Sequence, residues 1–163
     1  MMNNQNVDHA ALKTNQALII ALNIIAFILN TPFLAAVVTL AMVSGTLRKA
    51  PGFSFFYRAL KGAGWIKPDI LQDNPEPHRF AQGFGGIVML IGSGALYAGA
   101  STFGWALVWL VIALAALNLF AGFCVGCALY YWLGRLSVPG FSISPPSDTF
   151  PGMKPKIKTA NGS

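Results

Sequence analysis

The chain has 163 residues, of which 55% are hydrophobic and only 10% are charged. Soluble domains carry about 25% charged residues, so this composition excludes an ordinary water-soluble protein and favours one surrounded by lipid. The net charge of +6 does not indicate nucleic-acid binding, because the basic residues flank apolar runs and form no stripe with interleaved aromatic residues.

The first apolar run covers residues 14–47 and contains no Asp, Glu, Lys or Arg. It follows a polar N-terminal segment, residues 1–13. Pro32 divides the run, because proline suits the first turn of a new helix. The pattern predicts membrane-spanning helices over 10–29 and 32–47, since about 20 apolar residues cross a bilayer. A single long helix kinked at Pro32 is the competing interpretation.

The connection over residues 50–77 mixes aromatic with basic side chains. Such a mixture is typical of a segment that lies in the lipid headgroup region. The sequence therefore predicts an interfacial connector on the cytoplasmic side. Its aromatic and basic residues include Phe53, Phe55, Phe56, Tyr57, Arg58, Lys61, Trp65 and Lys67.

The second apolar run covers residues 80–134 and also lacks charged residues. Small residues and two glycines over 98–104 predict a loop that divides this run. Helices are expected over 78–97 and 105–134. The last helix would be about 45 Å long at about 1.5 Å per residue, so it would tilt or project from the bilayer.

Basic residues fall on one side of a four-helix arrangement. Neither hairpin loop, 30–32 or 98–104, carries a charge, whereas cytoplasmic loops are enriched in Lys and Arg. We therefore predict an all-α integral membrane bundle, four transmembrane helices in two hairpins, within residues 14–136. Both termini would lie on the cytoplasmic side of the cytoplasmic (inner) membrane. The basic residues are Lys13, Arg48, Lys49, Arg58, Lys61, Lys67, Arg79, Arg135, Lys154, Lys156 and Lys158.

The C-terminal tail, residues 137–163, contains five of the prolines, at 139, 145, 146, 151 and 155. A segment rich in proline adopts extended structure and builds no core of its own. The tail is therefore expected to be held by a protein partner.

Cys124 and Cys127 form a Cys-x-x-Cys pair that overlaps a Gly-xxx-Gly pair, Gly122 and Gly126. The glycines predict close approach of another helix. The cysteines can cycle between dithiol and disulfide or pass a sulfur atom, or they can simply fill space in the helix. A four-cysteine zinc site within the chain is excluded because there is no second pair, and no metal site is predicted.

The pair is expected inside the long last helix, in its cytoplasmic half, where a permanent disulfide does not form because the compartment is reducing. His78 and Arg79, at the start of the third helix, lie on the same side. Either cation would lower the pKa of a nearby thiol. Alternatively, Arg79 anchors the helix in headgroups and His78 is structural.

Asn23 and Asn118 interrupt apolar helices. Polar groups in lipid usually face other helices and form hydrogen bonds there, so both are predicted to hold helices together. The sequence contains no serine–histidine–acid set, and no acidic residue lies within a predicted span. A carboxylate proton relay across the membrane is therefore not expected.

Two pieces of the chain, His78-Arg79-Phe80-Ala81-Gln82 and residues 121–130 around Gly-Phe-Cys-Val-Gly-Cys, resemble a bacterial membrane family, domain of unknown function 4395. The resemblance covers roughly residues 15–136. It implies a small multi-span membrane protein without an established activity. Members tend to be associated with thioredoxin-like or sulfur-transfer proteins, which implies a cytoplasmic thiol protein as a partner. The proline-rich tail departs from this pattern.

Two functions from different classes remain. The first is a non-enzymatic subunit or partner-binding component of a larger membrane complex, indicated by packing glycines and the tail. The second is a membrane thiol redox or sulfur-relay protein that uses Cys124 and Cys127. A transporter is disfavoured by the lack of buried charge. The sequence predicts no particular cofactor, and binding of a pigment or a quinone is left as an alternative.

Overall fold

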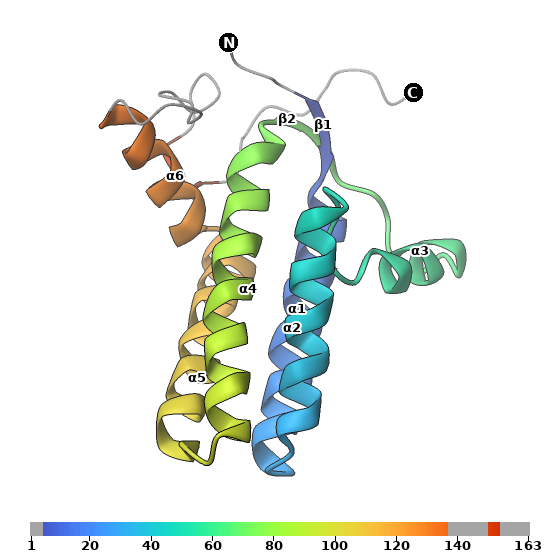
Figure 1. The fold of residues 1–163 in the computed structure, drawn as a ribbon. Helices are drawn as coiled ribbons and strands as arrows, with labels where there is room; N and C mark the ends of the chain where they lie inside the picture. The colour runs from blue at the N-terminus through green and yellow to red at the C-terminus, as the bar shows by residue number, and fades with distance from the viewer. Residues whose placement is uncertain (1–4, 137–149, 154–163) are drawn as a thin grey trace.

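The computed structural model describes residues 5–136 and 150–153, and within them the chain is mostly helical (Figure 1). Helices α1 (His9–Ile28) and α2 (Pro32–Leu47) form one hairpin. Helices α4 (Pro75–Tyr97) and α5 (Ser101–Ala116) form a second hairpin beside it. The expected all-α fold is confirmed.

Within the described residues, three helices are long and apolar enough to cross a membrane: α1, α4 and the helix that runs from Ser101 to Ala121. Helix α2 is apolar but shorter. Large apolar side chains such as Ile28, Leu40 and Ile87 are exposed on the outside of the bundle. A surface of this kind suits lipid better than water.

Helix ends follow from local sequence. The Asp8 side chain accepts a hydrogen bond from Ala10 N–H and begins α1. Asn74 does the same for Glu76 N–H at the start of α4. Prolines fit the first turn of a helix, so α4 begins at Pro75, three residues before the expected start at His78.

The core lies between the two hairpins and is built from apolar side chains such as Val38, Met89 and Val108, which are fully buried. Glycine brings α4 and α5 together. A Cβ atom on Gly104 would lie 2.8 Å from the carbonyl oxygen of Gly92, so any larger residue would push the helices apart.

A short ribbon closes one end of the bundle and was not expected from the sequence. Strands β1 (Gln5–Asp8) and β2 (Ile70–Asp73) pair antiparallel, with Asp8 opposite Ile70. Because the ribbon joins the chain just before α1 to the chain just before α4, it holds the first turns of these helices together.

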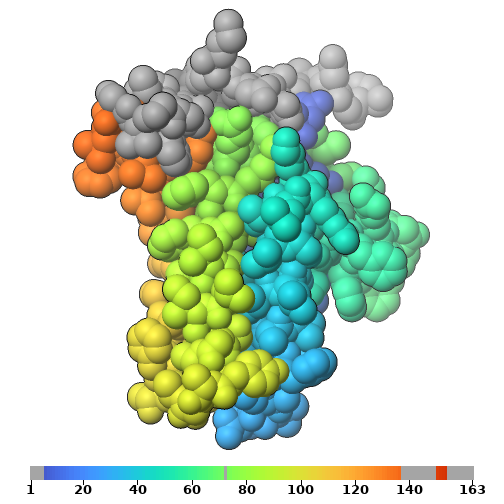
Figure 2. Space-filling model, in the orientation of Figure 1, coloured from blue at the N-terminus to red at the C-terminus, as the bar shows by residue number. Residues whose placement is uncertain are grey.

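The connector contains helix α3 (Ser54–Gly62), which lies beside the bundle (Figures 1 and 2). Phe55 and Trp65 are each 81% exposed, whereas Tyr57 is buried and donates a hydrogen bond to Asp8. Burial and this hydrogen bond raise the pKa of Tyr57 to about 12. The phenol therefore stays protonated and ties α3 to the ribbon.

The expected helix over 105–134 is interrupted. After α5 the chain forms a π-helix, η1 (Leu117–Ala121), and Gly122 then adopts φ 64°. Glycine takes this left-handed conformation without steric cost, and it commonly ends helices. A separate helix, α6 (Val125–Arg135), begins after the break and turns away from α5 (Figure 1).

One short part of the predicted tail is described, the tail segment Phe150–Met153. Phe123 pairs with Met153 in an antiparallel bridge, and Cys124 N–H donates a hydrogen bond to the carbonyl oxygen of Gly152 at 2.8 Å. The chain itself therefore holds this part of the tail. The other residues of the expected extended tail lie outside the described ranges.

Candidate functional site

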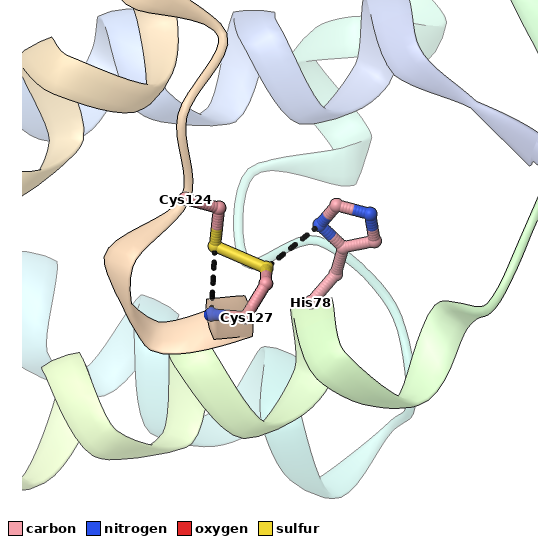
Figure 3. Close-up of side chains that lie close together, drawn as sticks. All are labelled: His78, Cys124 and Cys127. Carbon is pink, nitrogen blue, oxygen red and sulfur yellow. Dashed lines mark hydrogen bonds between the residues drawn. A yellow bond between two sulfur atoms is a disulfide. The ribbon is translucent and has the colours of Figure 1, made fainter. Parts of the chain in front are cut away.

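Cys124 and Cys127 are joined by a disulfide at the start of α6 (Figure 3). Cys124 is the N-cap of the helix, with an extended backbone, and Cys127 lies in the first turn. The break at Gly122 explains this placement. The pair thus lies at a helix N-terminus, not inside a continuous helix as expected from the sequence.

A helix N-terminus presents unpaired N–H groups and the positive end of the helix dipole. Here the Cys127 N–H donates a hydrogen bond to Cys124 Sγ at 3.2 Å. In the reduced protein this donor and the dipole would favour the thiolate form of Cys124. The position therefore makes Cys124 a good nucleophile and a good leaving group.

His78, from the first turn of α4, lies on the other side of the disulfide. Its Nδ1 atom is 3.5 Å from Cys127 Sγ, and its Nε2 atom is 2.9 Å from an Asp73 carboxylate oxygen. An ionised carboxylate only accepts hydrogen bonds, so Nε2 carries the proton. In the neutral imidazole, Nδ1 is then the unprotonated atom, and it faces the sulfur as a proton acceptor requires.

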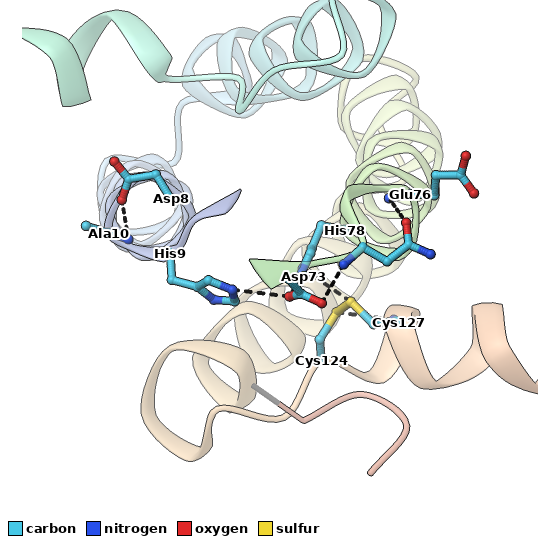
Figure 4. Close-up of polar contacts among 9 residues, drawn as sticks. Asp8, His9, Ala10, Asp73, Glu76, His78, Cys124 and Cys127 are labelled. Carbon is cyan, nitrogen blue, oxygen red and sulfur yellow. Dashed lines mark hydrogen bonds and ion pairs between the residues drawn. A yellow bond between two sulfur atoms is a disulfide. The ribbon is translucent and has the colours of Figure 1, made fainter. Parts of the chain in front are cut away.

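Asp73 ends β2 and lies between two histidines (Figure 4). The same carboxylate oxygen contacts His78 Nε2 and, at 3.2 Å, His9 Nε2. The Asn74 N–H donates to the other oxygen at 2.7 Å. Burial alone would raise the pKa of Asp73, but the hydrogen bonds from His78 and His9 outweigh it and hold that pKa at about 2.

These contacts form one continuous row from Asp73 through His78 to Cys127 and Cys124. When the pair is reduced, His78 can take the Cys127 proton, and Asp73 stabilises the imidazolium that results. Cys124 and Cys127 are only 5% and 3% exposed, so the site is closed to bulk water. The arrangement can hold, release and re-form a disulfide.

Two overlapping sets of side chains have metal-ligand atoms within 4.8 Å of one another, and His78 belongs to both. In the first set the two sulfurs are bonded to each other, which removes the thiolates that a metal would need. In the second set, Asp73 already accepts a hydrogen bond from His78 and lies in ion-pair contact with His9. The prediction of no metal site stays untested.

A cavity of about 130 Å³ lies beside Cys124 and His78, inside the bundle. Its walls come from α1, α2, α4, α5, η1 and α6, and they are mainly apolar. Asn118 of the π-helix contributes one of the polar groups. The residues that line it include Ile19, Gln82, Val111, Ala115, Asn118 and Leu129.

Of the two expected tuning residues, the structure brings only His78 to the cysteines. Arg79 lines a second cavity with Asp8 and Pro51. No hydrogen bond joins Arg79 to either sulfur in the described parts of the chain. The two residues are neighbours in sequence, but successive side chains on a helix point about 100° apart.

The two glycines of the Gly-xxx-Gly pair have different roles. A Cβ atom on Gly126 would lie 2.6 Å from Ala81 Cβ, so Gly126 allows α6 to touch α4. At Gly122 a Cβ atom would meet open space. This glycine instead adopts the left-handed backbone conformation that interrupts the helix. Only Gly126 therefore acts in helix packing.

The two asparagines also differ from the expected interhelical hydrogen bonds. Asn23 is fully buried, and neither of its side-chain polar atoms has a partner among residues 5–136 and 150–153. The structure gives no physical reason for this. Asn118 lines the cavity.

Sequence reasoning missed Asp73 and His9. Both lie next to helix starts, which the side chains of Asp8 and Asn74 cap. The signal that was available is the placement of Asp73 five residues before His78, but only the β1–β2 pairing brings His9 to the same point. No local pattern predicts that pairing.

Residues 7–135 match the family described as domain of unknown function (DUF4395). The chain belongs to this family. The DUF4395 match ends before the tail segment. It includes all the residues of the site described above: His9, Asp73, His78, Cys124 and Cys127. No curated protein and no solved structure matches the chain. The description of the DUF4395 family assigns no activity.

Proposed function

We propose that this protein is a membrane thiol–disulfide redox protein in which Cys124 and Cys127 alternate between disulfide and dithiol. The observation that carries the proposal is the placement of His78 Nδ1 beside Cys127 Sγ, with the pair at the start of α6. This favours the redox hypothesis over the non-enzymatic subunit. A membrane protein partner stays a prediction.

The cycle starts when a thiolate of a partner dithiol attacks Cys124 Sγ. The Cys124–Cys127 bond breaks, a mixed disulfide forms, and Cys127 leaves as a thiolate. The proton of the attacking thiol passes through His78 Nδ1 to Cys127. The second partner thiolate then attacks the mixed disulfide and expels Cys124, whose charge the α6 N-terminus stabilises. The partner loses two electrons and two protons. The cysteine pair gains the two electrons, and it becomes a dithiol when the expelled Cys124 thiolate takes up the second proton.

The proposal includes a four-span arrangement in which α1, α2, α4 and α5 all cross the bilayer. Helix α2 has 16 residues, or about 24 Å at about 1.5 Å per residue, and flanking Arg48 and Lys49 can extend its reach to the headgroups. Both hairpin turns lie at the end away from the ribbon (Figure 1). By the positive-inside rule the disulfide end faces the cytoplasm.

Labelling tests the arrangement. In a Cys124→Ser/Cys127→Ser background, single cysteines replace Thr31, Thr102 or Lys61, and intact cells receive a membrane-impermeant maleimide. The four-span proposal expects labelling of T31C and T102C but not of K61C. Labelling of K61C together with protection of either turn would contradict it.

Trapping tests the redox function. In Cys127→Ser, the Cys124 thiolate attacks the disulfide of the oxidised partner and expels one partner thiolate. Because Cys127 is absent and cannot attack Cys124 Sγ to complete the exchange, a covalent complex with the partner accumulates and disappears on reduction. Cys124→Ser is the matched control and forms no such complex, because it lacks the Cys124 sulfur and the remaining Cys127 Sγ faces His78. If neither variant, or both equally, form complexes, the assignment of Cys124 as the attacked sulfur is wrong.

A further inference from the structure

We propose that the cavity beside the disulfide binds the ring of a quinone, which takes two electrons from the reduced Cys124–Cys127 pair. This inference rests on the proposed redox function and names the electron acceptor that the cycle needs. Its starting point is that Cys124 and His78 both line the cavity, together with the spanning helices.

The walls of the cavity determine the polarity of its ligand. They include Ile19 of α1 and Val111 and Leu114 of α5, which lie in helices long and apolar enough to cross a bilayer. They also include Leu129 of α6, the helix that follows α5 and η1. A ligand that fits these walls is apolar and arrives from the lipid phase. An engineered cavity of about 150 Å³ in another protein binds benzene. A cavity of about 130 Å³ therefore suits one six-membered ring.

The polar groups of the cavity match a ring that carries carbonyl oxygens. Asn15 accepts a hydrogen bond from Phe53 N–H, and Gln82 donates to the carbonyl oxygen of Met42. Both are thus occupied. Asn118 lines the cavity and has no side-chain hydrogen bond to any residue in the described ranges. Its amide can donate to a quinone oxygen. It lies in η1, and π-helical turns frequently mark functional sites.

The electron balance also points to this class of ligand. The Cys124 thiolate adds to the quinone ring, and the Cys127 thiolate then attacks Cys124 Sγ. The sulfur–sulfur bond forms, the carbon–sulfur bond breaks, and its electron pair stays on the ring. The two thiol protons end on the two oxygens, with His78 carrying the one from Cys127. One dithiol and one quinone give one disulfide and one quinol.

The test uses the full-length protein in lipid nanodiscs, reduced with dithiothreitol, freed of reductant and kept anaerobic. Decylubiquinone is the probe, because all its ring positions are substituted and free thiols react with it slowly. Its ultraviolet absorbance reports quinol formation, and alkylation followed by mass spectrometry reports the cysteines. We expect one quinol per protein and a re-formed disulfide. Cys124→Ser should form none.

Two variants place the reaction in the cavity. Ala115→Phe fills it and should slow quinol formation about tenfold or more. Ala113→Phe, on the exposed side of the same helix, is the matched control and should react at the wild-type rate. Asn118→Ala, a milder change, should raise the quinone concentration for half-maximal rate about tenfold through one lost hydrogen bond. Dithiothreitol should still reduce the disulfide in all three.

The outcomes separate the inference from the function on which it rests. If dithiothreitol reduces the pair and a small disulfide re-oxidises it, but decylubiquinone does not, the quinone site is wrong and the redox function stands. If Ala115→Phe and Asn118→Ala both react like Ala113→Phe, the cavity is not the site. If the pair never accepts electrons in the folded protein, both proposals fail.

Discussion

The Nδ1 atom of His78 lies 3.5 Å from the Sγ atom of Cys127, although the two residues are 49 positions apart in the chain. The contact depends on the close approach of α6 to α4, which Gly126 permits opposite Ala81. It also depends on Asp73, which orients the imidazole through Nε2. The packing of two helices therefore determines the chemistry proposed for the pair.

His78→Ala should make the Cys127 thiol harder to ionise. In a Cys124→Ser background, the pH midpoint for iodoacetamide alkylation should move upward, and the rate at pH 7 should fall about tenfold, the effect of about one pKa unit. Arg79→Ala is the control and should leave the profile unchanged. Equal shifts in the two variants would mean that only general positive charge acts on the thiol.

Asp73→Asn should destabilise the protein at neutral pH. The folded-state pKa of Asp73 is about 2, below its ordinary value of about 3.9, so its charge stabilises the fold above pH ~4. That stability is lost as pH falls toward the folded pKa. Denaturation in detergent, followed by tryptophan fluorescence, should show a loss of about 2 kcal/mol at pH 7. The difference from wild type should shrink between pH 4 and 2, and a constant difference would contradict this account.

Gly126→Ala should separate α6 from α4, because its Cβ atom would overlap Ala81. Overpacking of this kind costs about 1–3 kcal/mol. The double variant Gly126→Ala/Ala81→Gly removes the contact with Ala81 Cβ at 2.6 Å but leaves the contact with the Cα atom of residue 81 at 2.8 Å, so it should recover only part of the thermal stability in detergent. Gly122→Ala is strained by its backbone, about 1–2 kcal/mol, and Ala81→Gly should not rescue it. Rescue of both would show that the left-handed turn is unimportant.

Removal of the tail segment should expose the disulfide. A chain that stops before Phe150 loses the hydrogen bond from Cys124 N–H to Gly152 and the bridge to Met153. Its reduction by dithiothreitol should be about tenfold faster, as expected if about 1.4 kcal/mol of protection is lost. A chain that stops before Lys154 keeps the segment and is the control. Identical rates for the two chains would show that the segment does not limit access to the sulfurs.

The helices were predictable because their signals are local. Helix α2 runs over Pro32–Leu47, where Pro32 and the charge-free run place it, and α1 begins within one residue of the expected start. Asn74 caps α4 as its sequence suggests. Membership in the DUF4395 family was also predicted, from the residues around His78 and Cys124.

The site was only partly predictable because its geometry is set by contacts between distant residues. A glycine inside an apolar run usually predicts close helix packing. The sequence therefore did not predict the left-handed turn at Gly122 or the helix N-terminus that follows it. Asp73 and His9 meet only through the pairing of two strands of four residues each. Strands this short contain too few residues to show the alternation of apolar and polar side chains that would predict them.

The most direct test of the central claim is a redox titration of the wild-type protein in nanodiscs, with graded ratios of reduced to oxidised dithiothreitol and mass spectrometry after alkylation. The account predicts that Cys124 and Cys127 convert together, in one two-electron transition with a slope of about 30 mV per tenfold change in ratio. Two cysteines that stay unpaired thiols at every ratio, or that titrate separately, would contradict it.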